Sequence, residues 1–488
     1  MAFEQAGFKN AIYALEAPND PTWSLEDARH SAIVYKPSDV PNASGPHVND
    51  PRSGEILESH INWYHNVMKL LHSWYFVQVS AIDERARSMQ FPDELMGELI
   101  RFVSAHEVGH TLGLRHNFRA SSTIPVEKLR DREWLRNNHH TPSMMDYARF
   151  NYVAQPEDSI KGFGIIPGVG IYDKWSVEWG YRYMPQFETA ADEKTYLNNW
   201  IMAKLKEDVR YEFGTETDPN DPRNQNEDLG DNAMKASEYG IRNMKRVVPN
   251  LLEWTREPNS DFSNAHNMYN EIVGQYGRYM GHVTRNIGGI YTTPKYVEQQ
   301  GDVHEHVPAA TQREAMAFLA KQLFETPTWL INRDLIMRAS INPQASIGNV
   351  QRNVLQRIIS KGTIDRLLHN EIMNAAKAYT VTQMFDELRR AVWSEFSAGR
   401  QVDIYRRNLQ KMYVDELIKI VAASEPVGLG ITIRVGNPLP SDAVAIARLQ
   451  LFELRRLLQS GAQSAHALTR AHAMDMIAQI NQALEGKK

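Results

Sequence analysis

HEVGHTLGLRH, residues 106–116, places three histidines, one glutamate and two glycines within eleven residues. The pattern around it predicts a helix that begins at FPDELMGEL (91–99), where Pro92 suits a first-turn position and two acidic residues follow. Apolar residues and the first two histidines recur at spacings of three or four as far as about Leu112. Both histidines therefore continue the apolar stripe and are expected to face inward.

The spacing of these side chains suits a single metal ion. His106 and His110, at i and i+4 of a helix, project from one face, so both Nε2 atoms can reach one ion at about 2.0–2.1 Å. Gly113 can adopt a positive φ and turn the chain back, which brings His116 to the same ion. Glu107 points near the ion without binding it and can take a proton from a metal-activated water. Three neutral ligands leave one position open for water and a carbonyl group.

The overall composition excludes several other classes of protein. The 488 residues include no cysteine, so any metal site must use histidine, carboxylate or other oxygen ligands. The net charge of −5 lacks the basic footprint of nucleic-acid binding. No apolar run approaches the roughly 18 residues of a membrane span. The start, MAFEQAGFKNA, has neither the basic nor the apolar region of a signal peptide.

A second signal lies downstream, at TPSMMDYARF (141–150). The HExxHxxGxxH motif followed by a methionine in a tight turn is typical of the metzincin proteases, which this sequence resembles. In astacin-like and serralysin-like enzymes the turn ends in Met-x-Tyr, and Met145 and Tyr147 have that spacing. The resemblance implies that Met145, rather than Met144, forms an apolar floor beneath the ligands. It also implies that Tyr147 reaches the metal or donates a hydrogen bond to the developing oxyanion.

Longer stretches resemble bacterial zinc-dependent metalloproteases with a Met-zincin domain, a family common in Bacteroidetes. These stretches are NDPRSGEI (49–56), HEVGHTLGLRHNF (106–118), SMMDYARFNYVAQPED (143–158), YDKWSVEWGYR (172–182), DPRNQNEDLGDNAMKASEYG (221–240), YMGHVTRNIGGIY (279–291) and VDIYRRNLQKMYVD (402–415). By this resemblance the cofactor is one Zn²⁺ ion and the protein is exported to the periplasm, the cell envelope or the exterior. FEQAGFKNAI resembles the latter part of the first metzincin helix, so the preceding strand and upstream domains are expected to be missing. Asn117, after the third ligand, differs from the residues that mark the better-known metzincin subfamilies.

The predicted fold class is α+β. Residues 1–185 are expected to form the metzincin-like catalytic domain, with a twisted sheet, an active-site helix and a Met-turn, and residues 186–488 a largely α-helical region. AIVYKPS (32–38) has strand character, a long loop is predicted at 37–54, and Asp173 is a candidate cap of a short helix at 172–184. Further helices are predicted near 234–256, 262–283, 310–325, 350–360, 364–378, 381–397, 402–423 and 440–485.

GEILESHINW (54–63) alternates between apolar and polar residues. The alternation predicts a half-buried or edge strand, and the start of the following helix is the alternative. In related clans an edge strand above the metal pairs with the substrate backbone. This segment is our candidate for that role, against the alternative of a strand that only packs.

The remaining polar loops, histidines and tryptophans are predicted to have structural roles and not to bind a metal. Residues 215–232 are predicted to be a polar, acidic surface loop without the glycine and terminal glutamate of a calcium-binding EF-hand. The His139–His140 pair is predicted to lie in a solvated turn and His304–His306 on a polar loop. Trp175 and Trp179, one helical turn apart, are expected in the core.

The sequence thus predicts a zinc-dependent endopeptidase that acts on peptides or proteins, with His106, His110 and His116 as ligands. Glu107 is the general base that deprotonates the attacking water. Two alternatives remain open. One is a metal-binding or scaffolding module that has lost catalysis. The other is a gluzincin-type aminopeptidase, which takes a downstream glutamate as third ligand and is disfavoured by the GxxH continuation.

Overall fold

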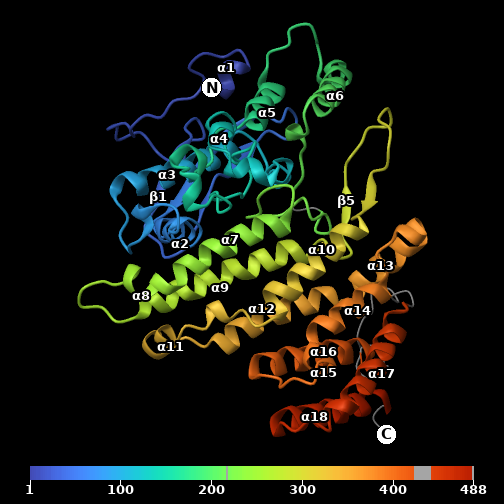
Figure 1. Cartoon of the computed structure of the whole chain (residues 1–488). Helices are drawn as coiled ribbons and strands as arrows, with labels where there is room; N and C mark the ends of the chain where they lie inside the picture. Colours follow the sequence, from blue (N-terminus) through green and yellow to red (C-terminus); the bar gives the residue numbers. More distant parts are fainter. Residues whose placement is uncertain (216–217, 423–440, 486–488) are drawn as a thin grey trace, which may run out of the picture. The chain divides into compact units, whose positions relative to one another are not determined.

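The computed structural model describes residues 1–215, 218–422 and 441–485 of the chain (Figure 1). Sheet and helices both occur, so the predicted α+β class is confirmed. The chain divides into two compact units. The first consists of Met1–Pro219, Arg223–Gln275 and Lys295–Gly301, and the second of Asn220–Pro222, Tyr276–Pro294 and Asp302–Lys488. The expected boundary at residue 185 stays a prediction.

The first unit holds the sheet and the segment with the three histidines. Its elements are α1 (Ala2–Gln5), β1 (Ala32–Lys36), β2 (Ala43–Ser44), β3 (His47–Asn49), β4 (Ile56–Tyr64), α2 (Val67–Val79), α3 (Asp93–Thr111), α4 (Arg132–Asn138), α5 (Ile171–Tyr181), α6 (Ala190–Glu207), α7 (Ala233–Val247), α8 (Leu251–Trp254) and the part of α9 (Ser263–Thr284) up to residue 275.

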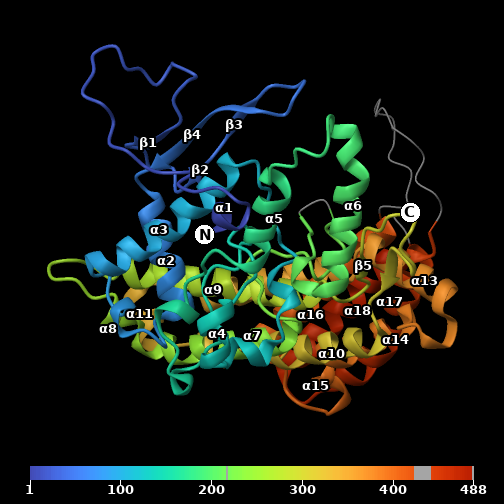
Figure 2. The ribbon, with the colours of Figure 1, turned by 90° about the horizontal axis from the view of Figure 1, so that it is seen from above.

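The C-terminal half of strand β4 lies inside the sheet, whereas residues 56–59 pair with β3 on one side only. The strand pairs in parallel with β1, from Ala32↔His60 to Lys36↔Tyr64, and antiparallel with β2 and β3 on its other side (Figure 2). The predicted half-buried strand is therefore confirmed, and the edge alternative does not hold for its C-terminal half, which is paired on both sides. The physical reason is that residues 43–49, predicted to belong to a long loop, fold back and satisfy the second side of β4.

One face of β4 joins the helices in a shared apolar core. Ile61 and Trp63 alternate with half-buried residues along the strand, as expected for a strand with one buried face. The core combines this face with apolar residues of α2, α3 and the segment 135–165. Its buried members are Trp63, Val67, Leu71, Tyr75, Val79, Ala86, Leu95, Leu99, Phe102, Val103, Leu135, Phe150, Ala154, Ile160 and Ile165. The core fixes α3, the helix that carries two of the histidines.

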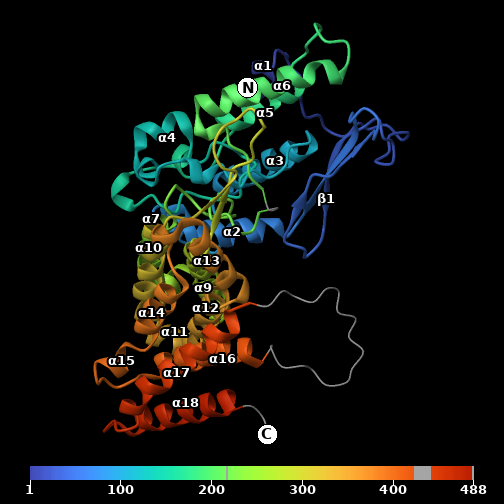
Figure 3. The same cartoon turned by 90° about the vertical axis from the view of Figure 1, so that its right-hand side faces the viewer.

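The second unit is mostly helical. It contains the rest of α9, the short hairpin β5 (Ile290–Thr292) and β6 (His304–His306), α10 (Ala309–Leu319) with a π-helical turn at Ala320–Phe324, α11 (Arg333–Ala339), α12 (Pro343–Ile358), α13 (Lys361–Asn374), α14 (Val381–Val392), α15 (Ser394–Ser397), α16 (Ile404–Ala422), α17 (Ala443–Gly461) and α18 (Ala467–Glu485). Helices α16, α17 and α18 pack against one another (Figure 3). The predicted loop at His304–His306 is a strand.

The helix predictions need correction at several places, and the predicted helices 234–256 and 381–397 are each divided in two. Residues 441–485 form two helices, because turn hydrogen bonds at Ser460–Gln463 and Gly461–Ser464 interrupt the α-helical pattern. Helix α12 begins at Pro343, where Asn342 caps Ala345 N, and not near 350. Helix α6 was not predicted. It has no buried residue, so it shows no strong apolar stripe, and its signal is the capping box that begins at Thr189. Residues 423 and 440 of the predicted helices lie outside the described residues.

Trp175 is buried as predicted, but Trp179 is 37% exposed. None of the helices in the described part of the chain combines the length and the apolar composition needed to cross a bilayer.

Candidate metal centre

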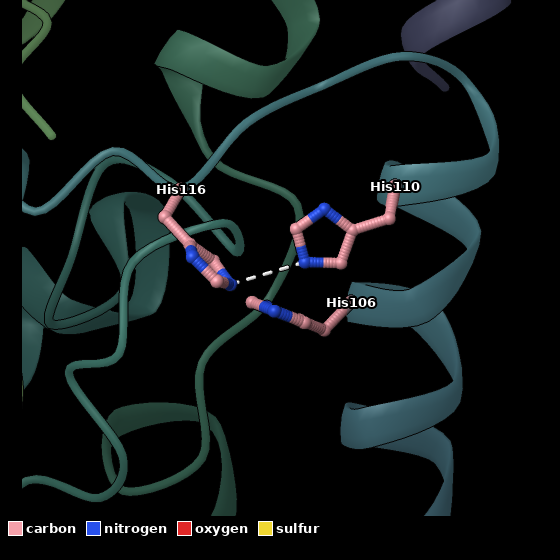
Figure 4. Close-up of side chains that lie close together, drawn as sticks. All are labelled: His106, His110 and His116. Carbon is pink, nitrogen blue, oxygen red and sulfur yellow. Dashed lines mark hydrogen bonds between the residues drawn. The ribbon is translucent and has the colours of Figure 1, made fainter. Parts of the chain in front are cut away.

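Three histidine side chains meet at the C-terminal end of α3. His106 and His110 project from its last two turns, and His116 comes from the loop that follows (Figure 4). The Nε2 atoms of His110 and His116 lie 3.1 Å apart. Two ligand nitrogens of a tetrahedral zinc ion, each about 2.0–2.1 Å from it, are separated by about 3.3 Å. Within the described residues, this is the one group of three or more His, Asp or Glu side chains whose ligand atoms all lie within 4.8 Å of one another.

Hydrogen bonds set the tautomers of the two helical histidines. Nδ1 of His106 lies 2.8 Å from the carbonyl oxygen of Met144, and Nδ1 of His110 lies 2.9 Å from that of Leu114. Because a carbonyl only accepts, each Nδ1 carries the hydrogen and each Nε2 presents its lone pair. Burial lowers the pKa of His106 to about 3 and also lowers the pKa of His110. Both rings are therefore neutral, the form that binds a metal.

The Nε2 atom of His106 is buried and has no hydrogen-bond partner. A buried nitrogen without a partner is costly and needs a physical explanation. A metal ion at the convergence point would supply the missing partner. The donor set of three imidazoles, with no thiolate in the chain, fits zinc.

The turn after α3 delivers His116. Gly113 has φ +80°, a left-handed conformation that favours glycine. Its N–H donates to the carbonyl of His110, and the N–H of Leu114 donates to that of Gly109. These two bonds form a Schellman motif, which ends the helix and reverses the chain.

Met145 lies directly beneath α3, at the level of the histidines. A Cβ on Gly109 would overlap the Met145 thioether, so only glycine allows this close approach. The side chain of Met145 is 2% exposed. Its carbonyl accepts the N–H of Asn117, and Asp173 at the start of α5 accepts the N–H of Met144 at 2.7 Å. The same carboxylate accepts the N–H of Gly170, which is the N-cap of α5, so Asp173 lies at the third helical position and not at the predicted cap position.

Glu107 is buried beside the ligands and contacts the sheet. Its carboxylate accepts a hydrogen bond from the backbone N–H of Gly45, which lies between β2 and β3. Burial raises the pKa of Glu107 to about 7, and the Gly45 bond opposes that rise. A Cβ on Gly45 would overlap the Glu107 carbonyl oxygen and come within 3.3 Å of the His110 Cβ. The edge segment of the sheet thus lies close against the helix that carries the ligands.

Tyr147 completes the group of residues singled out from the sequence. The centroid of its ring is 4.3 Å from that of His116 and 5.3 Å from that of His106. Phe118 lies on another side of the Tyr147 ring, at 5.6 Å. The structure therefore brings the rings of the three histidines and Tyr147 together, with Met145 against Gly109 and the buried Glu107 next to His106 in α3.

The sequence model of a family described as Met-zincin matches residues 88–399, more than half of the chain. The chain belongs to the Met-zincin family. The match includes α3, the three histidines and the segment 143–150. No curated protein and no solved structure matches the chain.

Two predictions about the surroundings of the Met-zincin site are wrong. His140 is fully buried, with Nε2 3.2 Å from the carbonyl oxygen of Arg149, and His139 packs against Gly168, so the pair does not lie in a solvated turn. The described residues of the predicted surface loop 215–232 are mainly buried. The reason is that the loop forms hydrogen bonds with backbone groups inside the protein. For example, the N–H of Glu227 donates to the carbonyl of Tyr147 at 2.8 Å. Residues 216–217 lie outside the described residues.

The sequence analysis missed four residues that contact the Met-zincin site. Gly45 bonds Glu107, and Asn117 bonds Met145 O and, through its side chain, the backbone of residues 212–214. Arg149 and Glu227 adjoin Tyr147. The sequence offered a signal for two of these residues. Asn117 directly follows His116, and Glu227 lies in the stretch 221–240 that resembles the family. Nothing in the sequence around Gly45 indicates its contact with Glu107.

Proposed function

We propose that this protein is a zinc-dependent endopeptidase. The observation that carries the proposal is the convergence of three imidazoles, one with an unpartnered buried Nε2 atom, beside the buried Glu107. Membership of the Met-zincin family agrees with this chemistry. His106, His110 and His116 would hold one zinc ion through their Nε2 atoms.

A zinc ion held there would polarise the scissile carbonyl and lower the pKa of a bound water. Glu107 takes the proton of the attacking water and passes it to the leaving amine. Tyr147, beside the ring of His116, donates a hydrogen bond to the oxygen on which negative charge develops. Met145 supports the imidazoles from below and excludes water from that side.

We further propose that an extended peptide pairs with the edge formed by β2 and β3. This segment replaces β4 as the candidate, because it reaches Glu107 through Gly45 and the C-terminal half of β4 is paired on both sides. Residues 47–49 are exposed, and Gly45 next to them contacts Glu107. A substrate strand added to this edge would lie along α3, with its backbone near the three histidines.

The proposal is tested with the purified full-length protein loaded with zinc. Metal analysis should give one zinc ion per chain, and a mixed peptide library digested with the protein should show internal cuts by mass spectrometry. A chelator should abolish cleavage, and added zinc should restore it. The variant His116→Ala should lose the zinc.

Other outcomes would identify the alternatives. Stoichiometric zinc without cleavage of any peptide would contradict the proposal and indicate a silent metal-binding module. Removal of single N-terminal residues only would indicate an aminopeptidase. The three-histidine group contains no carboxylate, which favours the metzincin-type site over the gluzincin type.

Two further expectations belong to this proposal. The first is that residues 1–185 carry the catalytic chemistry and that residues 186–488 form a helical region behind it. Two residues of the segment 1–185 have partners beyond residue 185: Asn117 bonds the backbone of residues 212–214, and Tyr147 bonds Glu227. Residues 1–185 expressed alone would lose these bonds and should therefore be less stable than the 488-residue chain. The second is export, by resemblance to the family, which cell fractionation of the native producer would test.

A further inference from the structure

Tyr147 contacts a small buried assembly formed by Arg149 and Glu227. Its backbone carbonyl accepts the N–H of Glu227 at 2.8 Å. The guanidinium carbon of Arg149 lies 4.6 Å from the centroid of its ring. The tyrosine ring therefore lies between a cation on one side and the ring of His116 on another, 4.3 Å away.

Arg149 is itself fixed by two partners. Its guanidinium stacks on the indole of Trp74 in α2, with 3.3 Å between the guanidinium carbon and the ring centroid. One of its terminal nitrogens lies 3.6 Å from Oε1 of Glu227. The side chains of Arg149 and Glu227 are 12% and 5% exposed. A planar cation stacked on one ring and paired with a buried carboxylate has little freedom to move.

Both residues that hold Tyr147 have strained backbones. Arg149 has φ 57° and Glu227 has φ 63°, in the left-handed region that non-glycine residues rarely occupy. Such conformations persist only where the surrounding structure enforces them, and they cluster at functional sites. Here the surroundings include the buried His140, whose Nε2 lies 3.2 Å from the Arg149 carbonyl oxygen.

We propose that Arg149, held by Trp74 and Glu227, is a positioning residue that fixes the ring of Tyr147 for hydrogen-bond donation in the reaction. This inference rests on the proposed function, because it assigns a supporting group to the same site. The cation near the Tyr147 ring draws electron density from it, which strengthens donation by the hydroxyl toward developing negative charge. Glu227 balances the charge of Arg149 and also anchors the Tyr147 backbone.

A double-mutant cycle tests whether Arg149 acts through Tyr147. Tyr147→Phe should lower kcat by about 10²-fold, because it removes the hydrogen-bond donor. Arg149→Met should lower kcat by about tenfold and change KM by less than twofold, because a mispositioned donor weakens stabilisation of the transition state and not substrate binding. In the Tyr147→Phe background, Arg149→Met should change kcat by less than about twofold. Equal losses in the two backgrounds, or an unchanged kcat in the single variant, would overturn the proposal.

Two further variants separate positioning from folding. Arg149→Lys keeps the charge but not the planar stack, and should recover part of the kcat lost in Arg149→Met. Arg136→Met is the matched control, since Arg136 lies over Phe163 at 5.8 Å in the same unit and does not contact Tyr147. It should leave kcat unchanged. A loss of zinc in Arg149→Met, measured by metal analysis, would contradict the positioning role.

A readout that needs no turnover distinguishes failure of this inference from failure of the proposed function. Cobalt substituted for zinc reports the ligand geometry through its visible absorption, and Tyr147 packs on the ligand His116. Arg149→Met should shift this absorption in the unaltered background and not in a Tyr147→Ala background, which removes the ring that contacts His116. If the unaltered protein cleaves no peptide, the proposed function fails while the cobalt spectra still decide whether Arg149 positions Tyr147. Identical spectra for the unaltered protein and Arg149→Met would reject the inference.

Discussion

The backbone N–H of Gly45 donates a hydrogen bond to the carboxylate of Glu107, across 62 positions of sequence. This bond connects the edge of the sheet to the residue proposed as general base. It also orients one carboxylate oxygen and leaves the other for a water. The absence of a side chain at position 45 permits the approach, because a Cβ there would overlap the Glu107 carbonyl oxygen.

Gly45→Ala should impair catalysis without loss of the metal. The added methyl group would push the strand away from α3, and the N–H would leave the Glu107 carboxylate. We expect kcat to fall by about 10²-fold, with zinc content unchanged by metal analysis. Gly97→Ala in α3 is the control, since a Cβ at position 97 meets no atom within 4 Å. Full activity of Gly45→Ala would show that the bond does not position Glu107.

Glu107→Gln should keep the zinc and lose turnover. The amide has nearly the same shape, so the three histidines remain in place, but it cannot accept the proton of the attacking water. A general base contributes about 10²–10⁴-fold to the rate, and kcat on a cleaved peptide should fall by that factor. Glu94→Gln, an exposed glutamate in the first turn of the same helix, should have no effect. Wild-type turnover by Glu107→Gln would reject the proposed mechanism.

Gly109→Ala should weaken zinc binding and stability together. The methyl group would displace the Met145 thioether, which lies against Gly109 and is almost fully buried. Overpacking of this kind costs about 1–3 kcal/mol, and loss of support for the ligands lowers metal affinity by about tenfold. Chemical denaturation and chelator competition measure the two effects. The same Gly97→Ala variant should leave zinc affinity unchanged and raise stability by about 0.5–1 kcal/mol, since alanine is favoured over glycine inside a helix. An unaffected Gly109→Ala would argue against a supporting role for Met145.

Because His140 is buried, we expect the protein to lose stability in acid. Burial lowers the pKa of His140 to about 3, and the neighbouring His139 adds to the effect. The unfolded chain has a histidine pKa of about 6.5, so below that pH it binds a proton that the folded state excludes. The free energy of unfolding should therefore fall as pH drops from about 6.5 toward about 3, by at most about 1.4 kcal/mol per pH unit from this residue.

The comparison of His140→Gln with the unaltered protein checks this window. Denaturation at several pH values should show a shallower acid slope in the variant. His30→Gln is the control, because the His30 side chain is 43% exposed and should leave the slope unchanged. An unaltered slope in His140→Gln would show that another group controls the acid transition.

The metal ligands could be predicted from the sequence because their geometry is local. The i, i+4 spacing of His106 and His110 sets both rings on one face of α3, and the turn at Gly113 needs only a residue that tolerates a positive φ. His116 then lies three residues further on. Hydrogen bonds within four or five residues complete this arrangement, so no distant part of the chain is needed to foresee it.

The surroundings of the site could not be predicted in the same way. β4 reads as an edge strand because its alternation does not reveal that residues 43–49 return to pair with its second side. His139–His140 and the loop 215–232 read as solvent-exposed because they are polar. Their burial depends on carbonyl and N–H partners, such as Arg149 O and Tyr147 O, that the folded chain supplies.

The sequence by itself thus determined the identity and spacing of the three histidines proposed as ligands, the adjacent carboxylate of Glu107 and the position of Met145 and Tyr147 after the motif. Only the tertiary structure decided how these groups are supported. Gly45 reaches Glu107 from the sheet, and Arg149 and Glu227 hold Tyr147. The physical reason is that helix periodicity and turn propensity act over a few residues, whereas support for a catalytic group comes from contacts between segments far apart in the chain.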